Sequence, residues 1–207
     1  MQPTHSALRA FIEELPLGHP VATQSFQRFG NRDAADKALS RLVHEGAIKR
    51  VVRGVYVRPE VSPILGELSV PLEDVAAALA EAEGARVQVS GETALNLLRL
   101  STQVPAQAVL YTDGVSHTLR RGNMTLRLKH VNPKVLVCAG TDAAVILSAL
   151  YVLGRDGVTA AVFGQLQQLI TPSVLDELRA KRTQMIGWMR RIVEILPVTD
   201  ASLPETR

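Results

Sequence analysis

The sequence predicts an α+β protein built from two parts. The first part, residues 1–60, contains short amphipathic helices followed by a two-stranded ribbon, and the second mixes strands with helices and ends in a helical segment. Two observations separate them: prolines cluster between residues 59 and 71, and the excess of basic residues stops at residue 60. The expected divisions are a domain over 1–60, a linker over 61–71, a C-terminal domain over 72–196 and a frayed tail over 197–207.

Composition excludes several classes of protein. The chain has 207 residues, of which 46% are hydrophobic and 21% charged, a globular composition that is too apolar for a disordered protein. No uninterrupted apolar run approaches the ~18 residues of a membrane span, and the first residues lack the pattern of a signal peptide. The single cysteine, Cys138, excludes an internal disulfide. We therefore expect a cytoplasmic protein that does not enter a membrane.

The positive charge is distributed unevenly along the chain. Residues 1–60 hold nine Lys/Arg and six Asp/Glu, whereas residues 61–207 hold 14 of each. All of the net charge of +3 therefore lies in the first part. This asymmetry predicts a polyanion-binding part joined to an electrically neutral one.

Capping residues and helical spacing define the elements of the first part. A serine begins the first helix, a glycine closes the second, and an asparagine caps the third. β-branched residues on both sides of Gly54 indicate a ribbon. The expected elements are helices over Ser6–Leu15, Thr23–Phe29 and Asn31–Gly46, and strands over 47–53 and 55–58.

The second part contains alternating signals. An Ala-rich helix is followed by a short strand, by a helix that Ser90 caps, and by two β-like runs that turn residues flank. Helical periodicity dominates from Asp142 onward. The expected elements are helices over 72–82, 91–100, 142–153, 159–170 and 173–196, and strands over 87–89, around 109–111 and over 124–131.

Three helices followed by a ribbon is the order of a winged helix-turn-helix, in which the third helix enters the DNA major groove and the ribbon contacts the backbone. The third helix has two faces: small and apolar residues from Ala35 to Val43 would dock on the other helices, and a polar face would meet DNA. The ribbon adds basic residues suited to phosphate contacts. The candidate DNA-binding residues are Arg32, Lys37, Ser40, Arg41, His44, Lys49, Arg50, Arg53 and Arg58. Two alternatives stay open: a merely solvated charged face, and a winged helix that binds protein.

Motifs for catalysis are missing from the sequence. It contains no phosphate-binding glycine loop, no His-Glu-x-x-His zinc motif and no Gly-x-Ser-x-Gly elbow. Ser116 and His117 are neighbours that a strand would point to opposite faces, and His117 and His130 lack the further ligands of a metal site. Cys138 lies in an apolar run and is expected to be buried. We therefore expect no enzymatic activity, no cofactor and no metal.

Two stretches resemble the AbiEi-type antitoxins of bacterial abortive-infection systems. Ala38-Leu-Ser-Arg-Leu-Val-His-Glu-Gly-Ala-Ile-Lys-Arg-Val-Val-Arg-Gly-Val-Tyr-Val-Arg-Pro59 is similar to that family's winged helix. The run Val89-Ser-Gly-Glu-Thr-Ala-Leu-Asn-Leu-Leu-Arg-Leu-Ser-Thr-Gln-Val-Pro105 resembles part of its C-terminal domain, as do Leu110-Tyr-Thr-Asp-Gly114 and Leu126-Arg-Leu-Lys-His-Val-Asn-Pro133. Together these matches span roughly residues 20–195.

This resemblance implies two activities. The winged helix would bind inverted repeats of double-stranded DNA in the chain's own promoter and repress it, and the C-terminal domain would counteract a nucleotidyltransferase-like toxin as part of phage defence. Family members without a toxin gene also exist, and the family has no catalytic residues to carry over. The candidate partner surface comprises Arg120, Arg121, Arg127, Lys129, Arg179, Arg190 and Arg191. A solvated basic face explains these residues equally well.

The sequence also leaves different interpretations open. The run 90–105 fits a buried helix better than a contact surface. The chain could instead be a winged-helix transcription regulator whose C-terminal domain senses a small molecule, which a deep polar pocket would support. An enzyme whose site lacks a sequence motif is the third alternative.

Overall fold

The computed structural model describes residues 3–103 and 105–197. Two compact units make up the chain: Met1–Ala85 with His117–Leu126, and Arg86–Ser116 with Arg127–Arg207. The α+β class predicted from the sequence is confirmed. The boundary expected between residues 60 and 72 is not where the units divide, since the helix that begins at Leu72 belongs to the first unit. Of the frayed tail expected over 197–207, residues 198–207 lie outside the described part of the chain.

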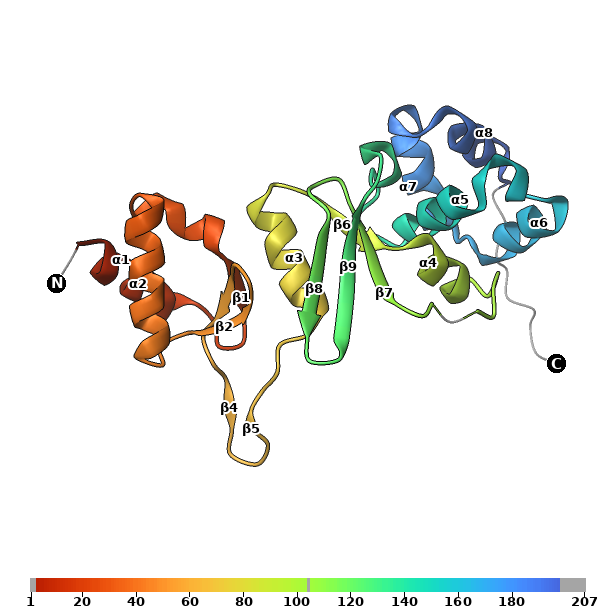
Figure 1. Ribbon diagram of the computed structural model, residues 1–207. Helices are drawn as coiled ribbons and strands as arrows, with labels where there is room; N and C mark the ends of the chain where they lie inside the picture. Colours follow the sequence, from red (N-terminus) through yellow and green to blue (C-terminus); the bar gives the residue numbers. More distant parts are fainter. Residues whose placement is uncertain (1–2, 104, 198–207) are drawn as a thin grey trace. The chain divides into compact units, whose positions relative to one another are not determined.

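The first unit begins with a winged helix (Figure 1). The sheet order is β1-β3-β2 with antiparallel pairing, so the strand between the first two helices joins the ribbon. This is the topology that the sequence predicts, and β1 is an addition where only a chain break was expected. Its elements are α1 (Pro3–Glu14), β1 (Pro20–Ala22), the 3₁₀ helix η1 (Thr23–Phe29), α2 (Arg32–His44), β2 (Lys49–Val52) and β3 (Val55–Val57).

Local signals explain most of these bounds. The Asn31 side chain accepts a hydrogen bond from the Ala34 backbone N–H at 2.9 Å, as its predicted role as N-cap of α2 requires. Ser6 does not cap α1, because that helix already begins at Pro3 and Ser6 lies within it. Val43 is 37% exposed, at the edge of the face that was expected to be fully docked.

Apolar side chains from α1, η1 and α2 form the core of the winged helix. α2 contributes only alanines and leucines to it, so this helix lies close to its neighbours and keeps its polar face outward. Phe11, Phe26 and Tyr56 add edge-to-face ring contacts. The buried members are Leu8, Ile12, Val21, Phe26, Ala38, Leu39, Leu42 and Ile48.

The stretch 61–71, expected to be a linker, contains a small hairpin of β4 (Val61–Ser62) and β5 (Gly66–Glu67). The Leu68 backbone N–H donates to the Glu60 carbonyl at 2.8 Å and closes its base. Helix α3 (Leu72–Ala82) follows with the bounds that the sequence predicts, and it contacts β1 of the winged helix. Its buried face is why residues 72–85 belong to the first unit rather than to a separate C-terminal domain.

A four-stranded sheet has the order β6-β7-β9-β8, with β6 and β7 antiparallel. The turn Gly122-Asn123 joins β8 to β9, and Gly122 has the positive φ of 57° that favours glycine there. Strand signals in the sequence placed β6, β7 and β9 within one or two residues. The strands are β6 (Val87–Val89), β7 (Ala108–Thr112), β8 (His117–Arg121) and β9 (Met124–His130).

Helices of the second unit enclose its largest core, centred on α5 (Figure 1). α4 ends at Leu97 rather than residue 100, because Arg99 has a φ of 55°. The helix expected over 173–196 is interrupted, since Met185 adopts an extended conformation. The helices are α4 (Gly91–Leu97), η2 (Pro133–Val135), α5 (Ala143–Gly157), α6 (Ala160–Leu169), α7 (Pro172–Lys181), η3 (Arg182–Gln184) and α8 (Gly187–Ile195).

Candidate nucleic-acid interface

The polar face of α2 carries exposed side chains that lack partners within the described residues. The side chains of Lys37, Ser40, Arg41 and His44 are exposed, and none makes an ion pair or hydrogen bond within residues 3–103 and 105–197. Arg32, at the start of the same helix, lies 3.9 Å from the Asp36 carboxylate, a loose and exposed pair. The helix therefore presents basic and hydroxyl side chains that the fold itself does not use.

The wing is a tight hairpin whose tip is Arg53-Gly54. Gly54 has a φ of 81°, which a residue with a side chain rarely adopts. Its carbonyl accepts from both the backbone N–H of Thr23, at 2.8 Å, and the Thr23 hydroxyl, at 3.0 Å. These two bonds fix the wing against the start of η1. Arg53 is exposed at the tip, and Arg50 lies two residues before the end of β2.

Two of the predicted phosphate-binding residues have intramolecular roles that sequence reasoning did not foresee. The Lys49 ammonium lies 2.6 Å from the Glu67 carboxylate of β5. One guanidinium nitrogen of Arg58 donates to the carbonyls of Glu13 and Leu15, at 2.9 and 3.2 Å, where α1 ends. Carbonyls at a helix C-terminus lack intrahelical partners, so Arg58 satisfies groups that would otherwise be unpaired.

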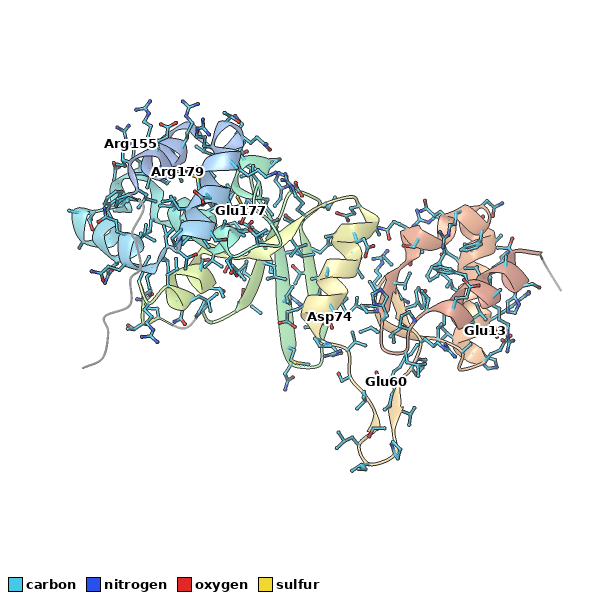
Figure 2. The ribbon with its side chains drawn as sticks, turned by 180° about the vertical axis from the view of Figure 1, so that it is seen from behind. Glu13, Glu60, Asp74, Arg155, Glu177 and Arg179 are labelled. Carbon is cyan, nitrogen blue, oxygen red and sulfur yellow. The ribbon has the colours of Figure 1, made fainter. Side chains whose placement is uncertain are left out.

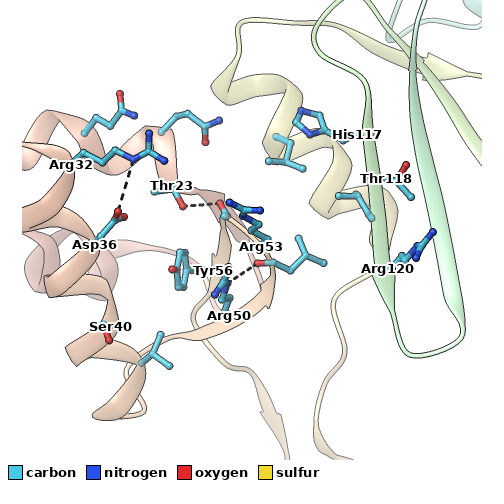
Figure 3. Close-up of a pocket in the computed structure, with 17 residues that line it drawn as sticks. Thr23, Arg32, Asp36, Ser40, Arg50, Arg53, Tyr56, His117, Thr118 and Arg120 are labelled. Atoms are coloured by element: carbon cyan, nitrogen blue, oxygen red, sulfur yellow. Dashed lines mark hydrogen bonds and ion pairs between the residues drawn. The ribbon is translucent and has the colours of Figure 1, made fainter.

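A cleft of about 960 Å³ lies beside α2 and the wing, within the first unit (Figure 3). Arg32 and Ser40 of α2, and Arg50 and Arg53 of the wing, line one side of it. β8 lines it as well, through residues 117–120. The cleft could not be predicted from the sequence, because no local pattern shows that β8 lies near β2.

Two of the seven residues of the predicted partner surface, Arg121 and Arg179, are engaged with backbone carbonyls. Arg121 donates to the carbonyl of Val70, and Arg179 donates to the carbonyl of Leu196 at 2.7 Å, so both support local structure. Arg179 and Glu177 both lie on α7 (Figure 2). Arg190 pairs loosely with Glu194 at 3.8 Å. The exposed members are Arg120 on β8, Arg127 and Lys129 on β9, and Arg190 and Arg191 on α8.

His117 and His130, on β8 and β9 of the four-stranded sheet, each have a different partner. His117 Nε2 lies 2.7 Å from the Glu83 carboxylate, and His130 Nδ1 lies 2.8 Å from the Gly114 carbonyl. The Ser116 hydroxyl accepts from the His130 backbone N–H instead of pairing with His117. Among the described residues, no three His, Cys, Asp or Glu side chains are grouped as metal ligands would be.

Residues 90–97 are partly buried, and Glu92 and Leu97 are exposed. The Ser90 hydroxyl accepts from the Thr93 backbone N–H at 3.4 Å, and Ser90, Gly91 and Ala94 are buried. The leucines that were expected to be buried are less so: Leu95, Leu98 and Leu100 are partly buried, and Leu97 is 60% exposed. Packing of α4 against α5 therefore accounts for Ser90, Gly91 and Ala94.

The fold and the unused basic face define a winged-helix protein with a second α/β unit. Residues 8–178 match the family described as "Family of unknown function (DUF6088)". Since this match spans most of the chain, the protein belongs to that family.

The remaining comparisons are distant. The crystal structure of the RV2827C protein from Mycobacterium tuberculosis resembles the chain at 16% identity and a TM-score of 0.32, over 94% of this chain and 72% of that one. No curated protein matches the sequence. Within the described residues, no helix has both the length and the apolar character that crossing a membrane requires.

Proposed function

We propose that this protein binds duplex DNA through α2 and the wing and represses transcription from its own promoter. One observation carries the proposal: the exposed face of α2 offers Lys37, Ser40, Arg41 and His44, none of which pairs within the described residues. Lys49 and Arg58, in contrast, have partners within the fold. A basic helix face without partners is therefore available to an external polyanion.

The geometry of a winged helix supports duplex DNA as that polyanion. An α-helix fits the major groove, which is about 12 Å wide, and long basic side chains reach guanine edges or phosphates from it. The wing then lies along the backbone, where Arg53 at the tip supplies affinity without sequence information. The two hydrogen bonds from Thr23 to Gly54 hold that tip in place before DNA arrives.

The second activity that we propose is that of an antitoxin in the cytoplasm. It rests on the resemblance of residues 89–133 to AbiEi-type antitoxins, and it assigns to the second unit the neutralisation of a nucleotidyltransferase-like toxin. Exposed basic residues on β9 and α8 are the candidate contacts: Arg127, Lys129, Arg190 and Arg191. A toxin with an acidic surface, or its nucleic-acid substrate, would complement this charge.

The test of DNA binding compares two triple variants of equal charge. K37A/R41A/R53A removes the proposed contacts, and R127A/K129A/R191A removes three basic residues outside the winged helix. Fluorescence anisotropy with a duplex from immediately upstream of the gene should show strong loss for the first variant only. A base-reading contact is worth about 1–3 kcal/mol, so loss of two or three contacts is readily measured. Wild-type affinity in K37A/R41A/R53A would refute the proposal.

A further inference from the structure

The cleft beside the wing has a second wall that the winged helix does not supply. α2 and β2 form one side, and His117, Thr118 and Arg120 of β8 lie across from them (Figure 3). All of these residues belong to the first unit, and β2 and β8 contact each other. α2 and the wing can form a winged-helix interface without this wall. The residues that β8 contributes therefore require a separate explanation.

The cleft is strongly basic. Four arginines line it, and Asp36 is its only carboxylate among the described residues. Asp36 already lies beside Arg32, and the Arg50 guanidinium makes one long bond of 3.4 Å to the Val52 carbonyl. Arg53 and Arg120 are exposed, and their side chains make no ion pair or hydrogen bond in the part of the chain that the structure describes. The cleft therefore has two cations available for an external ligand.

We propose that this cleft binds the sugar–phosphate backbone of one strand of the duplex that α2 reads, with Arg120 donating to a phosphate. The inference rests on the proposed function and extends it to β8. Arginine, hydroxyl and amide groups are the usual phosphate donors, and the lining includes Gln24, Gln27 and Thr118.

A row of phosphates fits this cleft better than a single small anion. The arginines come from α2, the wing and β8 rather than from one point. Phosphates recur along each strand about every 3.4 Å of helix axis, so cations spread along a cleft can each meet a different one. The inference also moves Arg120 from the predicted partner surface to the DNA interface.

The first experiment measures how R120Q changes affinity and its salt dependence. The full-length protein is titrated into two labelled duplexes, the upstream sequence and a scrambled sequence of equal composition, between about 50 and 200 mM salt. R120Q should bind both about three- to tenfold more weakly, and the slope of log affinity against log salt should flatten by about 0.9. R155Q, with the same charge change at an exposed position on α5, is the matched control and should behave as wild type.

A second measurement tests the position of the DNA directly. An iron–EDTA group is attached to T118C, and Cys138 stays unlabelled because it is buried. Hydroxyl radicals from T118C should cleave the backbone of bound DNA, whereas the same group on A7C, exposed on α1 and outside the cleft, should not. Cleavage by labelled T118C reports where the DNA lies, and a purely structural role of Arg120 would not produce it.

The outcomes distinguish this inference from the proposed function. Wild-type affinity and slope in R120Q, or intact DNA with labelled T118C, would overturn the role of β8 while K37A/R41A/R53A still loses binding. Normal binding by K37A/R41A/R53A would instead remove the DNA-binding function itself. If R120Q weakens the upstream duplex but not the scrambled one, Arg120 reads a base and the backbone assignment is wrong.

Discussion

Gly91 and Val152 approach each other so closely that no side chain fits between them. A Cβ on Gly91 would lie 2.3 Å from the Val152 Cβ and 2.8 Å from the Ser148 carbonyl oxygen, well inside contact distance. Gly91 opens α4 directly after the Ser90 cap, and α5 carries both neighbours. The Ser-Gly-Glu-Thr run thus combines a helix cap with a close helix–helix contact.

The first prediction concerns that contact. G91A should destabilise the protein by about 1–3 kcal/mol or more, because backbone and a branched side chain of α5 would have to shift. G164A is the matched control: it lies within α6 with open space around it, and it should stabilise by about 0.5–1 kcal/mol through helix propensity. Urea unfolding followed by circular dichroism measures both. Equal effects of the two substitutions would contradict the close packing.

A second prediction concerns a buried network of hydrogen bonds between β6 and α5. Gln88 Nε2 donates to the Ser148 hydroxyl at 2.7 Å and to the Val135 carbonyl at 3.2 Å, and the Ser148 hydroxyl donates to the Val89 carbonyl at 2.7 Å. S148A removes an acceptor and a donor from a buried site, so it should cost about 1–3 kcal/mol of unfolding free energy. S173A, on the exposed start of α7, should change stability by less than about 0.5 kcal/mol.

A third prediction concerns acid stability. Burial alone would raise the pKa of Asp113, but hydrogen bonds from the Arg86 backbone at 2.7 Å and its guanidinium at 2.8 Å outweigh burial and hold that pKa below its ordinary value. Below about pH 4 the unfolded state therefore binds more protons, and this contribution to stability is lost as pH falls through the folded-state pKa.

D113N should accordingly be less stable than wild type near neutral pH, and the difference should shrink as the pH is lowered below about 4. Unfolding free energies across that range provide the measurement. D176N, at an exposed carboxyl of α7, controls for the loss of a negative charge. A gap between D113N and wild type that stays constant with pH would show that the Asp113 carboxylate is not the source.

Helices, strands and turns with local sequence signals could be predicted well. Asn31, Ser90 and Gly54 each lie at the cap or turn that their chemistry favours, and α3 and β6 have the expected bounds. Some local predictions were wrong, such as the cap at Ser6 and the unbroken helix through Met185, but the features missed at the candidate site are long-range. Nothing within residues 45–60 shows that Lys49 pairs with Glu67 or that Arg58 reaches back to α1. The cleft depends on β8, which begins 60 residues after the end of β3.

A fourth prediction concerns the single thiol. Burial is the main cause that raises the pKa of Cys138, to about 11, with a further contribution from the Glu177 charge. At pH 8 only about one thiol in a thousand would be ionised, against roughly a quarter for a free cysteine, so native protein should react with Ellman's reagent very slowly. In denaturing urea the reaction should be complete within mixing. Fast reaction of the folded protein would show that the α5–α7 core opens readily.

The last prediction is that repression and toxin neutralisation can be separated by point variants. A fragment lacking residues 1–67 is a poor test, because α3 buries Leu72, Val75 and Ala76 in the same unit as the winged helix and would lose its cover. K37A/R41A/R53A changes only exposed side chains, so its fold should remain intact. Supplied from an unrelated promoter, this variant should lose binding to the upstream duplex yet still rescue cells from the cognate toxin. R127A/K129A/R191A should show the reverse if β9 and α8 contact the partner. Should the DNA-binding variant lose rescue while its circular dichroism spectrum is unchanged, transcriptional silencing would be the antidote, and the second unit would not be the neutralising part.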